Sequence, residues 1–127
     1  MATRSTIALE YADGTVGQIY CHWDGYLSNN GEILLENYQD PFKVRELLDC
    51  GDMSTLDADI SDCEFYSDRG EECPQRMFKD FAEYKREAQM EEYNYILRRD
   101  GNWYVEFYGE FDGLLTEAFD HVVSEEV

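Results

Sequence analysis

The chain has 127 residues, the size of one domain, and its composition of 43% hydrophobic and 15% aromatic residues excludes wholesale disorder. The formal net charge is −19, from 29 acidic and 10 basic residues. This charge excludes nucleic acid and anionic membranes as direct partners, because both are negatively charged. We therefore expect a single globular domain over residues 1–127 with a cationic partner.

The N-terminal residues lack the basic and apolar stretches of a signal peptide, and no window reaches the ~20 apolar residues of a membrane span. These features predict a soluble, cytoplasmic protein. In that reducing compartment, cysteines are expected to be free, buried thiols. They are Cys21, Cys50, Cys63 and Cys73. A zinc site that uses some of Cys50, Cys63 and Cys73 with Cys21 or His22 is an alternative, although the spacing matches no short ligand pair.

Two β-prone runs, residues 5–11 and 16–23, flank a turn with Asp13-Gly14. An Asp-Gly between such runs predicts a β-hairpin, because its turn needs positive φ. A polar cluster at residues 28–31 follows, and apolar residues at helical spacing then predict a short helix over 32–38.

A second helix is predicted over residues 41–50, where Asp40 is a candidate N-cap, Pro41 suits the first helical position and Gly51 suits the C-terminal cap. Residues 51–72 have little periodicity and many acidic side chains. They are predicted to form a long, ordered but irregular acidic loop.

Helical spacing of apolar residues predicts a further helix over residues 74–89. Two alternating runs, 92–97 and 102–108, flank Asp100-Gly101 and predict a second hairpin. The last element is predicted to be a helix from about residue 113 that frays over 124–127.

Together these elements predict an α+β fold. We expect an antiparallel sheet built from an N-terminal and a C-terminal β-hairpin. Three to four helices would pack on one face of this sheet, with a long acidic loop beside it.

Charge is segregated along the chain. Residues 36–72 hold twelve acidic and three basic residues, residues 100–127 hold eight acidic and no basic residues, and residues 73–99 are slightly positive. The negative electrostatic potential of the protein should therefore come from residues 36–72 and 100–127. The candidate partner-binding residues are Asp49, Asp52, Asp57, Asp59, Asp62, Glu64, Asp68, Glu71, Glu72, Asp112, Glu117 and Asp120.

Carboxylates spaced along a rigid face imitate the phosphate charge of DNA, so one hypothesis is a DNA mimic that binds a basic, normally nucleic-acid-binding protein surface. Such a protein needs no catalytic residue and no cofactor, and its binding weakens with salt. One alternative is an interaction or scaffold module whose acidity only gives solubility. Another is a calcium site at Asp57, Asp59, Asp62 and Glu64, which lacks the central glycine of an EF-hand. A further alternative is a homodimer, in which two copies of the chain would form a longer acidic ridge.

No catalytic site is predicted. The chain has two histidines, His22 and His121, and it has no nucleophile elbow, phosphate loop or zinc-protease motif. His22 and Asp24 would share one side of an extended strand, which favours a structural His–Asp pair at the strand end over an acid–base pair.

Residues 19–26 read Ile-Tyr-Cys-His-Trp-Asp-Gly-Tyr and residues 66–71 read Tyr-Ser-Asp-Arg-Gly-Glu. With the first residues of the chain and the second hairpin, these segments resemble a group of small proteins of tailed bacteriophages and prophages. The resemblance covers most of the chain and implies a phage context without an established activity. It implies that the partner is a host or defence protein: a nuclease, a CRISPR effector, a restriction enzyme or a polymerase.

Within this resemblance, the distinctive core is His22, Trp23, Asp24, Gly25 and Tyr26. One interpretation is a structural turn in which Gly25 has positive φ and the two aromatic side chains pack in the core. The other is an exposed, partner-binding knob formed by Trp23 and Tyr26.

Overall fold

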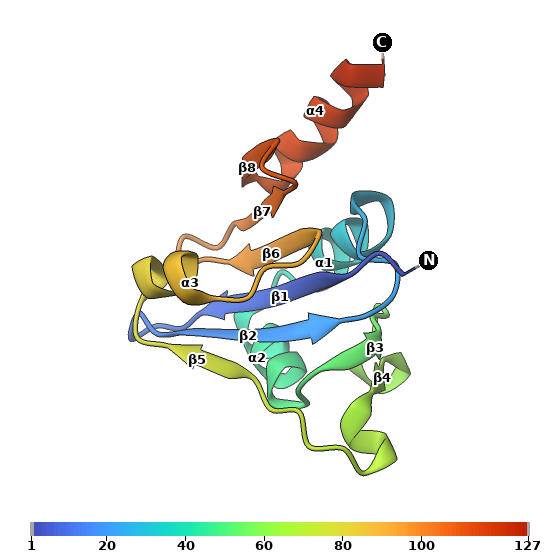
Figure 1. The fold of residues 1–127 in the computed structure, drawn as a ribbon, viewed down its shortest axis with the longest axis vertical. Coiled ribbons are helices and arrows are strands. Elements are labelled where there is room, and N and C mark those ends of the chain that lie inside the picture. The colour runs from blue at the N-terminus through green and yellow to red at the C-terminus, as the bar shows by residue number, and fades with distance from the viewer. Residues whose placement is uncertain (1, 127) are drawn as a thin grey trace.

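The computed structural model describes residues 2–126, and the side chains as far as His121. Within this range the fold is α+β, as predicted, with eight strands in one sheet of order β4-β3-β2-β1-β6-β7-β8 and with β5 paired to β2 (Figure 1). The strands are β1 (Ser5–Glu10), β2 (Val16–Cys21), β3 (Met53–Thr55), β4 (Glu64–Phe65), β5 (Arg76–Phe78), β6 (Tyr93–Leu97), β7 (Trp103–Phe107) and β8 (Phe111–Leu114). The α-helices are α1 (Glu32–Asn37), α2 (Pro41–Asp49), α3 (Phe81–Glu87) and α4 (Leu115–Glu126).

Both predicted hairpins are present. β1 pairs antiparallel with β2, and β6 pairs antiparallel with β7. The glycines of the two Asp-Gly turns have positive φ, 92° at Gly14 and 85° at Gly101, which is the conformation that favours glycine there.

The sheet is mixed, whereas an antiparallel sheet was predicted. The two hairpins meet through a parallel pairing of β1 with β6, from Ser5 opposite Tyr93 to Leu9 opposite Leu97. β2 also pairs in parallel with β3. Strands that pair in parallel need a long crossover connection. Helices α1 and α2 lie between β2 and β3 in the chain, and all the elements from β2 to α3 lie between β1 and β6.

Helices cover both faces of the sheet. Alternate strand residues, among them Ile7, Ile19 and Tyr95, point into a large core with α1, α2 and α4. On the other face Tyr84 of α3 packs in a smaller cluster that includes Ala8. Three helices thus share one face, and α3 alone among the described α-helices lies on the opposite face (Figure 1).

Helix α2 begins and ends close to its predicted bounds. The Asp40 side chain accepts a hydrogen bond from the backbone N–H of Phe42 at 3.0 Å, which caps the helix before Pro41. The short helix α1 is likewise confirmed at Glu32–Asn37.

The predicted helix over 74–89 is wrong in its first part. Met77 and its neighbours form β5, because they pair with β2. The helix α3 starts only after Asp80, whose side chain caps it by accepting from the N–H of Glu83 at 2.8 Å.

The acidic segment 51–72 contains the short strands β3 and β4 and two 3₁₀ turns, Ile60–Asp62 and Tyr66–Arg69. At the C-terminus, β8 precedes α4, and α4 continues through Glu126 where fraying was predicted over 124–127. Val127 lies outside the described residues. None of the helices in the described range has both the length and the apolar character required to span a membrane.

Candidate functional site

The two acidic sets lie at opposite edges of the sheet. Residues 49–72 include β3 and β4 at one edge, whereas Asp112 lies on β8 at the other edge, and Glu117 and Asp120 lie on the helix α4 that follows it (Figure 1). The predicted partner-binding residues therefore do not form one contiguous face. Each edge has to be considered on its own.

Four carboxylates at the β4 edge are exposed and form no ion pair with any lysine or arginine in the described part of the chain. We call them the acidic edge: Asp57, Asp59, Asp62 and Glu64. The buried Cys63 thiol holds this segment together, because its sulfur accepts from the N–H of Asp57 at 3.2 Å and lies 3.6 Å from the carbonyl oxygens of Asp57 and Asp59, to either of which its single proton can be donated. Burial raises the pKa of the Cys63 thiol, so it stays in the donor form.

The other acidic residues of this segment have different surroundings. Asp52 is partly buried, accepts from the N–H of Tyr20 at 2.8 Å and forms an ion pair with Arg76 at 3.0 Å, so it ties β2 to β5. Asp49 accepts from the side chain of Gln75 at 3.2 Å. The remaining three, Asp68, Glu71 and Glu72, are exposed.

The segment 22–26, which we call the aromatic turn, projects two aromatic side chains into solvent. Trp23 is 44% exposed and Tyr26 is 39% exposed. The backbone beneath them is fixed, because the N–H of Gly25 donates to the carbonyl of Thr3 at 2.8 Å and the Tyr95 hydroxyl donates to the carbonyl of Gly25 at 2.7 Å. Of the two interpretations of this segment, the one in which both aromatic side chains pack in the core is therefore wrong.

Gly25 is required for a different reason from the one predicted. Its φ is not positive, whereas Asp24 has a φ of 57°. A Cβ atom on Gly25 would lie 2.6 Å from the Cβ of Ser5, so only glycine fits this close approach of the turn to β1. The predicted His22–Asp24 pair is also replaced, because the His22 Nδ1 atom shares a hydrogen bond with the Tyr20 hydroxyl at 2.7 Å.

The aromatic turn and the acidic edge are neighbours on either side of β3. The N–H of Trp23 donates to the carbonyl of Ser54 at 2.9 Å, and the Ser54 hydroxyl lies 3.4 Å from the Glu64 carboxylate. On the far side of β3, Thr55 pairs with Glu64 of β4. The backbone of Trp23 and the carboxylate of Glu64 thus meet at Ser54, and we call the aromatic turn together with the acidic edge the docking surface.

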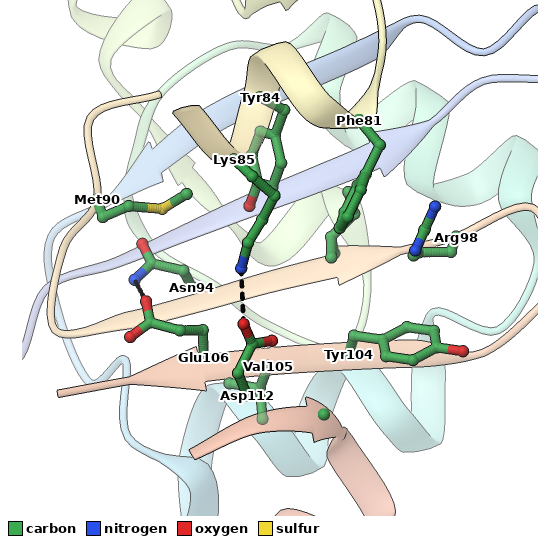
Figure 2. A pocket seen from close by; sticks show the side chains of 12 residues that line it. Phe81, Tyr84, Lys85, Met90, Asn94, Arg98, Tyr104, Val105, Glu106 and Asp112 are labelled. Atoms are coloured by element: carbon green, nitrogen blue, oxygen red, sulfur yellow. Dashed lines mark hydrogen bonds and ion pairs between the residues drawn. The ribbon is translucent and has the colours of Figure 1, made fainter. Parts of the chain in front are cut away.

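A cavity of about 330 Å³ lies between α3 and the strands β6, β7 and β8, on the face of the sheet that points away from the main core (Figure 2). We call it the α3 cavity. Aromatic and aliphatic residues form most of its walls, and its charged and amide residues are Lys85, Asn94, Arg98, Glu106 and Asp112 (Figure 2). The Arg98 guanidinium lies over the Phe81 ring, 3.6 Å from its centroid. Sequence analysis missed this cavity. The available signal was that polar residues such as Asn94 and Glu106 occupy the strand positions that point away from the main core.

Within the described residues no three His, Cys, Asp or Glu side chains are grouped so that they could hold a metal ion, and this includes the residues of the calcium and zinc alternatives. All four cysteines are free, with Cys21 and Cys63 buried and Cys50 and Cys73 partly buried. Comparison with known proteins found no family model, no curated protein and no solved structure that matches this chain.

Proposed function

We propose that this protein is a non-enzymatic acidic inhibitor that binds a basic, normally nucleic-acid-binding surface of another protein. The observation that carries the proposal is the docking surface, where the aromatic turn with the exposed Trp23 and Tyr26 adjoins, across β3, the edge whose four carboxylates form no ion pair with a described residue. No catalytic group is needed for such a function, because occupation of the partner's surface is sufficient.

The aromatic residues would supply most of the binding energy. Trp and Tyr are enriched among the residues that dominate protein interfaces, because their rigid rings bury large areas at low entropic cost. The bonds from Gly25 to Thr3 and from Tyr95 to Gly25 hold the turn in place before binding. Preorganisation of this kind reduces the entropic cost of association.

The acidic edge would select the partner and speed the encounter. Carboxylates that form no ion pair with a described residue of this protein are free to pair with lysine and arginine of the partner. Complementary charge also raises the association rate. A protein surface that normally holds DNA phosphates is a suitable target, because it presents closely spaced cations. The resemblance to phage proteins leads us to propose a host or defence protein as that target: a nuclease, a CRISPR effector, a restriction enzyme or a polymerase.

The C-terminal acidic residues have a separate role in this proposal. Glu117 and Asp120 lie on α4, which packs on the main-core face of the sheet and is not part of the edge formed by β3 and β4. We assign them to solubility, because distributed surface charge opposes self-association.

Displacement of DNA from purified proteins tests this function. A fluorescent duplex is bound to one member of each of the four partner classes, and its anisotropy is followed as the acidic protein is added. We expect release of the duplex from at least one class. For that class, we expect the dissociation constant of the complex between the two proteins, measured without DNA, to be about tenfold or more higher at 200 mM than at 50 mM salt. Failure to release the duplex from any class, or a dissociation constant that does not depend on salt, would contradict the proposal.

A further inference from the structure

Residues 57–59 of the acidic edge lie outside any helix or strand, between β3 and the 3₁₀ turn Ile60–Asp62. Their position therefore depends on side chains that bind their backbone, in place of a regular hydrogen-bond ladder. Three side chains do so: Tyr38, Lys43 and Cys63. They come from the C-terminal end of α1, from α2 and from the acidic segment itself.

The Tyr38 hydroxyl donates to the carbonyl of Asp57 at 2.6 Å. Tyr38 is buried, and burial is the main cause that raises the pKa of its hydroxyl, so the phenol stays protonated and remains a donor. The Cys63 sulfur lies 3.6 Å from the carbonyl oxygens of Asp57 and Asp59 and accepts from the N–H of Asp57. These contacts attach the first part of the acidic edge to the core.

Lys43 is the cation of this cluster, and its ammonium binds backbone carbonyls. The Nζ atom donates to the carbonyls of Ala58 and Asn37, both at 2.8 Å. It also lies 4.2 Å from the centroid of the Tyr38 ring, which is a cation–π contact. Hydrogen bonds from a charged donor are roughly twice as strong as neutral ones. Lys43 of α2 thus joins the end of α1 to the acidic segment.

The surroundings of Lys43 are acidic, yet it forms no ion pair with a carboxylate in the described part of the chain. An ion pair with the acidic edge is the contact expected if Lys43 served to compensate negative charge there. The observed bonds go to the backbone that carries Asp57 and Asp59. They leave these carboxylates available to a partner and fix the chain between them.

We propose that Lys43 is a positioning residue of the docking surface. Its ammonium and the Tyr38 hydroxyl fix the backbone of residues 57–59, so that Asp57 and Asp59 meet the partner in one arrangement. A fixed arrangement reduces the entropic cost of association. This inference rests on the proposed function, because it concerns how the acidic edge binds a cationic partner.

Two possible roles of the Lys43 charge predict opposite effects of its removal. Lys43→Met keeps an unbranched side chain and makes the protein one unit more negative. If net charge alone decided the affinity, a basic partner would bind this variant more tightly. If Lys43 positions the acidic edge, the partner binds more weakly, because the carbonyl of Ala58 loses its charged donor.

The dissociation constant is measured with a purified partner protein from which the wild-type protein displaces DNA. Lys43→Met should weaken binding about tenfold or more. The control is Lys79→Met, which removes an exposed lysine that forms no ion pair with a described residue and should bind within about twofold of wild type. Lys43→Arg, which keeps the charge and the N–H donors, should bind within about threefold of wild type.

Amide hydrogen exchange measures the order of the acidic edge without any partner. The N–H groups of Asp57 and Cys63 are hydrogen-bonded in the wild-type structure. Their exchange should be about tenfold or more faster in Lys43→Met. Exchange at Ile7 in the centre of the sheet should stay within about twofold of wild type, which separates loss of order at the edge from loss of global stability.

Tyr38→Phe is the second variant, and it keeps the inference testable if Lys43→Met does not fold. It removes only the hydroxyl and changes no charge, so it should speed exchange at the same amides and weaken binding about threefold or more. Binding by Lys43→Met as tight as by Lys79→Met, or unchanged exchange in both variants, would overturn the inference and leave the proposed function standing. Failure of the wild-type protein to displace DNA from any partner would overturn the proposed function and, with it, this inference.

Discussion

The Thr6 hydroxyl donates to the Oδ1 atom of Asn94 at 2.9 Å, across the parallel pair that joins the two hairpins. Oδ1 of Asn94 also accepts from the N–H of Glu91 at 2.9 Å. Its amide nitrogen donates to the carbonyl of Glu91 at 2.8 Å and to Glu106 at 3.0 Å. All four hydrogen-bonding positions of this buried amide are thus occupied, and they hold β1, β6 and β7 together.

Asn94→Ala should lower the free energy of unfolding by about 2–4 kcal/mol, because it leaves Thr6, Glu106 and the Glu91 backbone without a buried partner. Thr6→Val, which removes one of these bonds and keeps the side-chain shape, should cost about 1 kcal/mol. Urea denaturation measures both. An Asn94→Ala variant within about 0.5 kcal/mol of wild type would show that this junction does not hold the sheet together.

Gly25→Ala should destabilise the protein by about 1–3 kcal/mol, because the new Cβ would lie 2.6 Å from the Cβ of Ser5. Gly109→Ala is the control. It has open space around it and a φ of +69°, so it should cost only about 1 kcal/mol of backbone strain. Thermal denaturation compares the two variants, and a smaller cost at Gly25 than at Gly109 would contradict the close approach of the turn to β1.

Local sequence signals located the hairpins and α2, because their determinants lie within a few residues. Asp13-Gly14 and Asp100-Gly101 specify turns by positive φ, and Asp40-Pro41 specifies a helix start by capping. The short strands were missed because their conformation depends on distant partners. Met77 lies at helical spacing from its neighbours, yet it is in β5 because it pairs with Gly17. The parallel pairing of β1 with β6 has no signal in the local sequence.

The candidate site was predictable in its residue types and not in its arrangement. Composition and segment charge identified the acidic residues, but only the sheet order separates those of 49–72 from Asp112, Glu117 and Asp120. For Trp23 and Tyr26 the sequence left core and surface open, and the structure places both at the surface. The pairing of Glu106 with Asp112 depends on strand register, which one sequence does not reveal.

Stability should depend on pH through Glu10. Burial alone would raise the pKa of this carboxyl, but hydrogen bonds and charge from Arg98 and Arg99 outweigh burial and lower it below its ordinary 4.5. A lowered folded-state pKa gives stability that is present above the unfolded pKa and is lost as pH falls through the folded one. We therefore expect Glu10→Gln to be less stable than wild type at pH 7, with a difference that shrinks as the pH falls below 4.5.

Urea denaturation at several pH values checks this expectation. Glu36→Gln is the control, because Glu36 is exposed on α1 and forms no ion pair with a described residue. Its difference from wild type should stay within about 0.5 kcal/mol at every pH. A Glu10→Gln difference that does not vary with pH would contradict the role of the Glu10 charge.

The aromatic turn should act as the anchor of the docking surface. Substituting both Trp23→Ala and Tyr26→Ala should weaken DNA displacement about tenfold or more, because buried aromatic anchors contribute most of the energy of an interface. Tyr108→Ala is the matched control, since this residue is 59% exposed at the β7–β8 turn on the opposite edge. Equal loss in the control and in the double variant would indicate that the aromatic turn has no special role.

Two charge-reversal variants test the docking surface most directly, in the same displacement assay. One carries Asp59→Lys, Asp62→Lys and Glu64→Lys on the acidic edge, and the other carries Glu110→Lys, Glu117→Lys and Asp120→Lys at the opposite edge. Both change the net charge by the same amount and reverse only exposed carboxylates. The account predicts a loss of at least about tenfold for the first variant and less than about threefold for the second. Equal losses, or no loss in either variant, would contradict it.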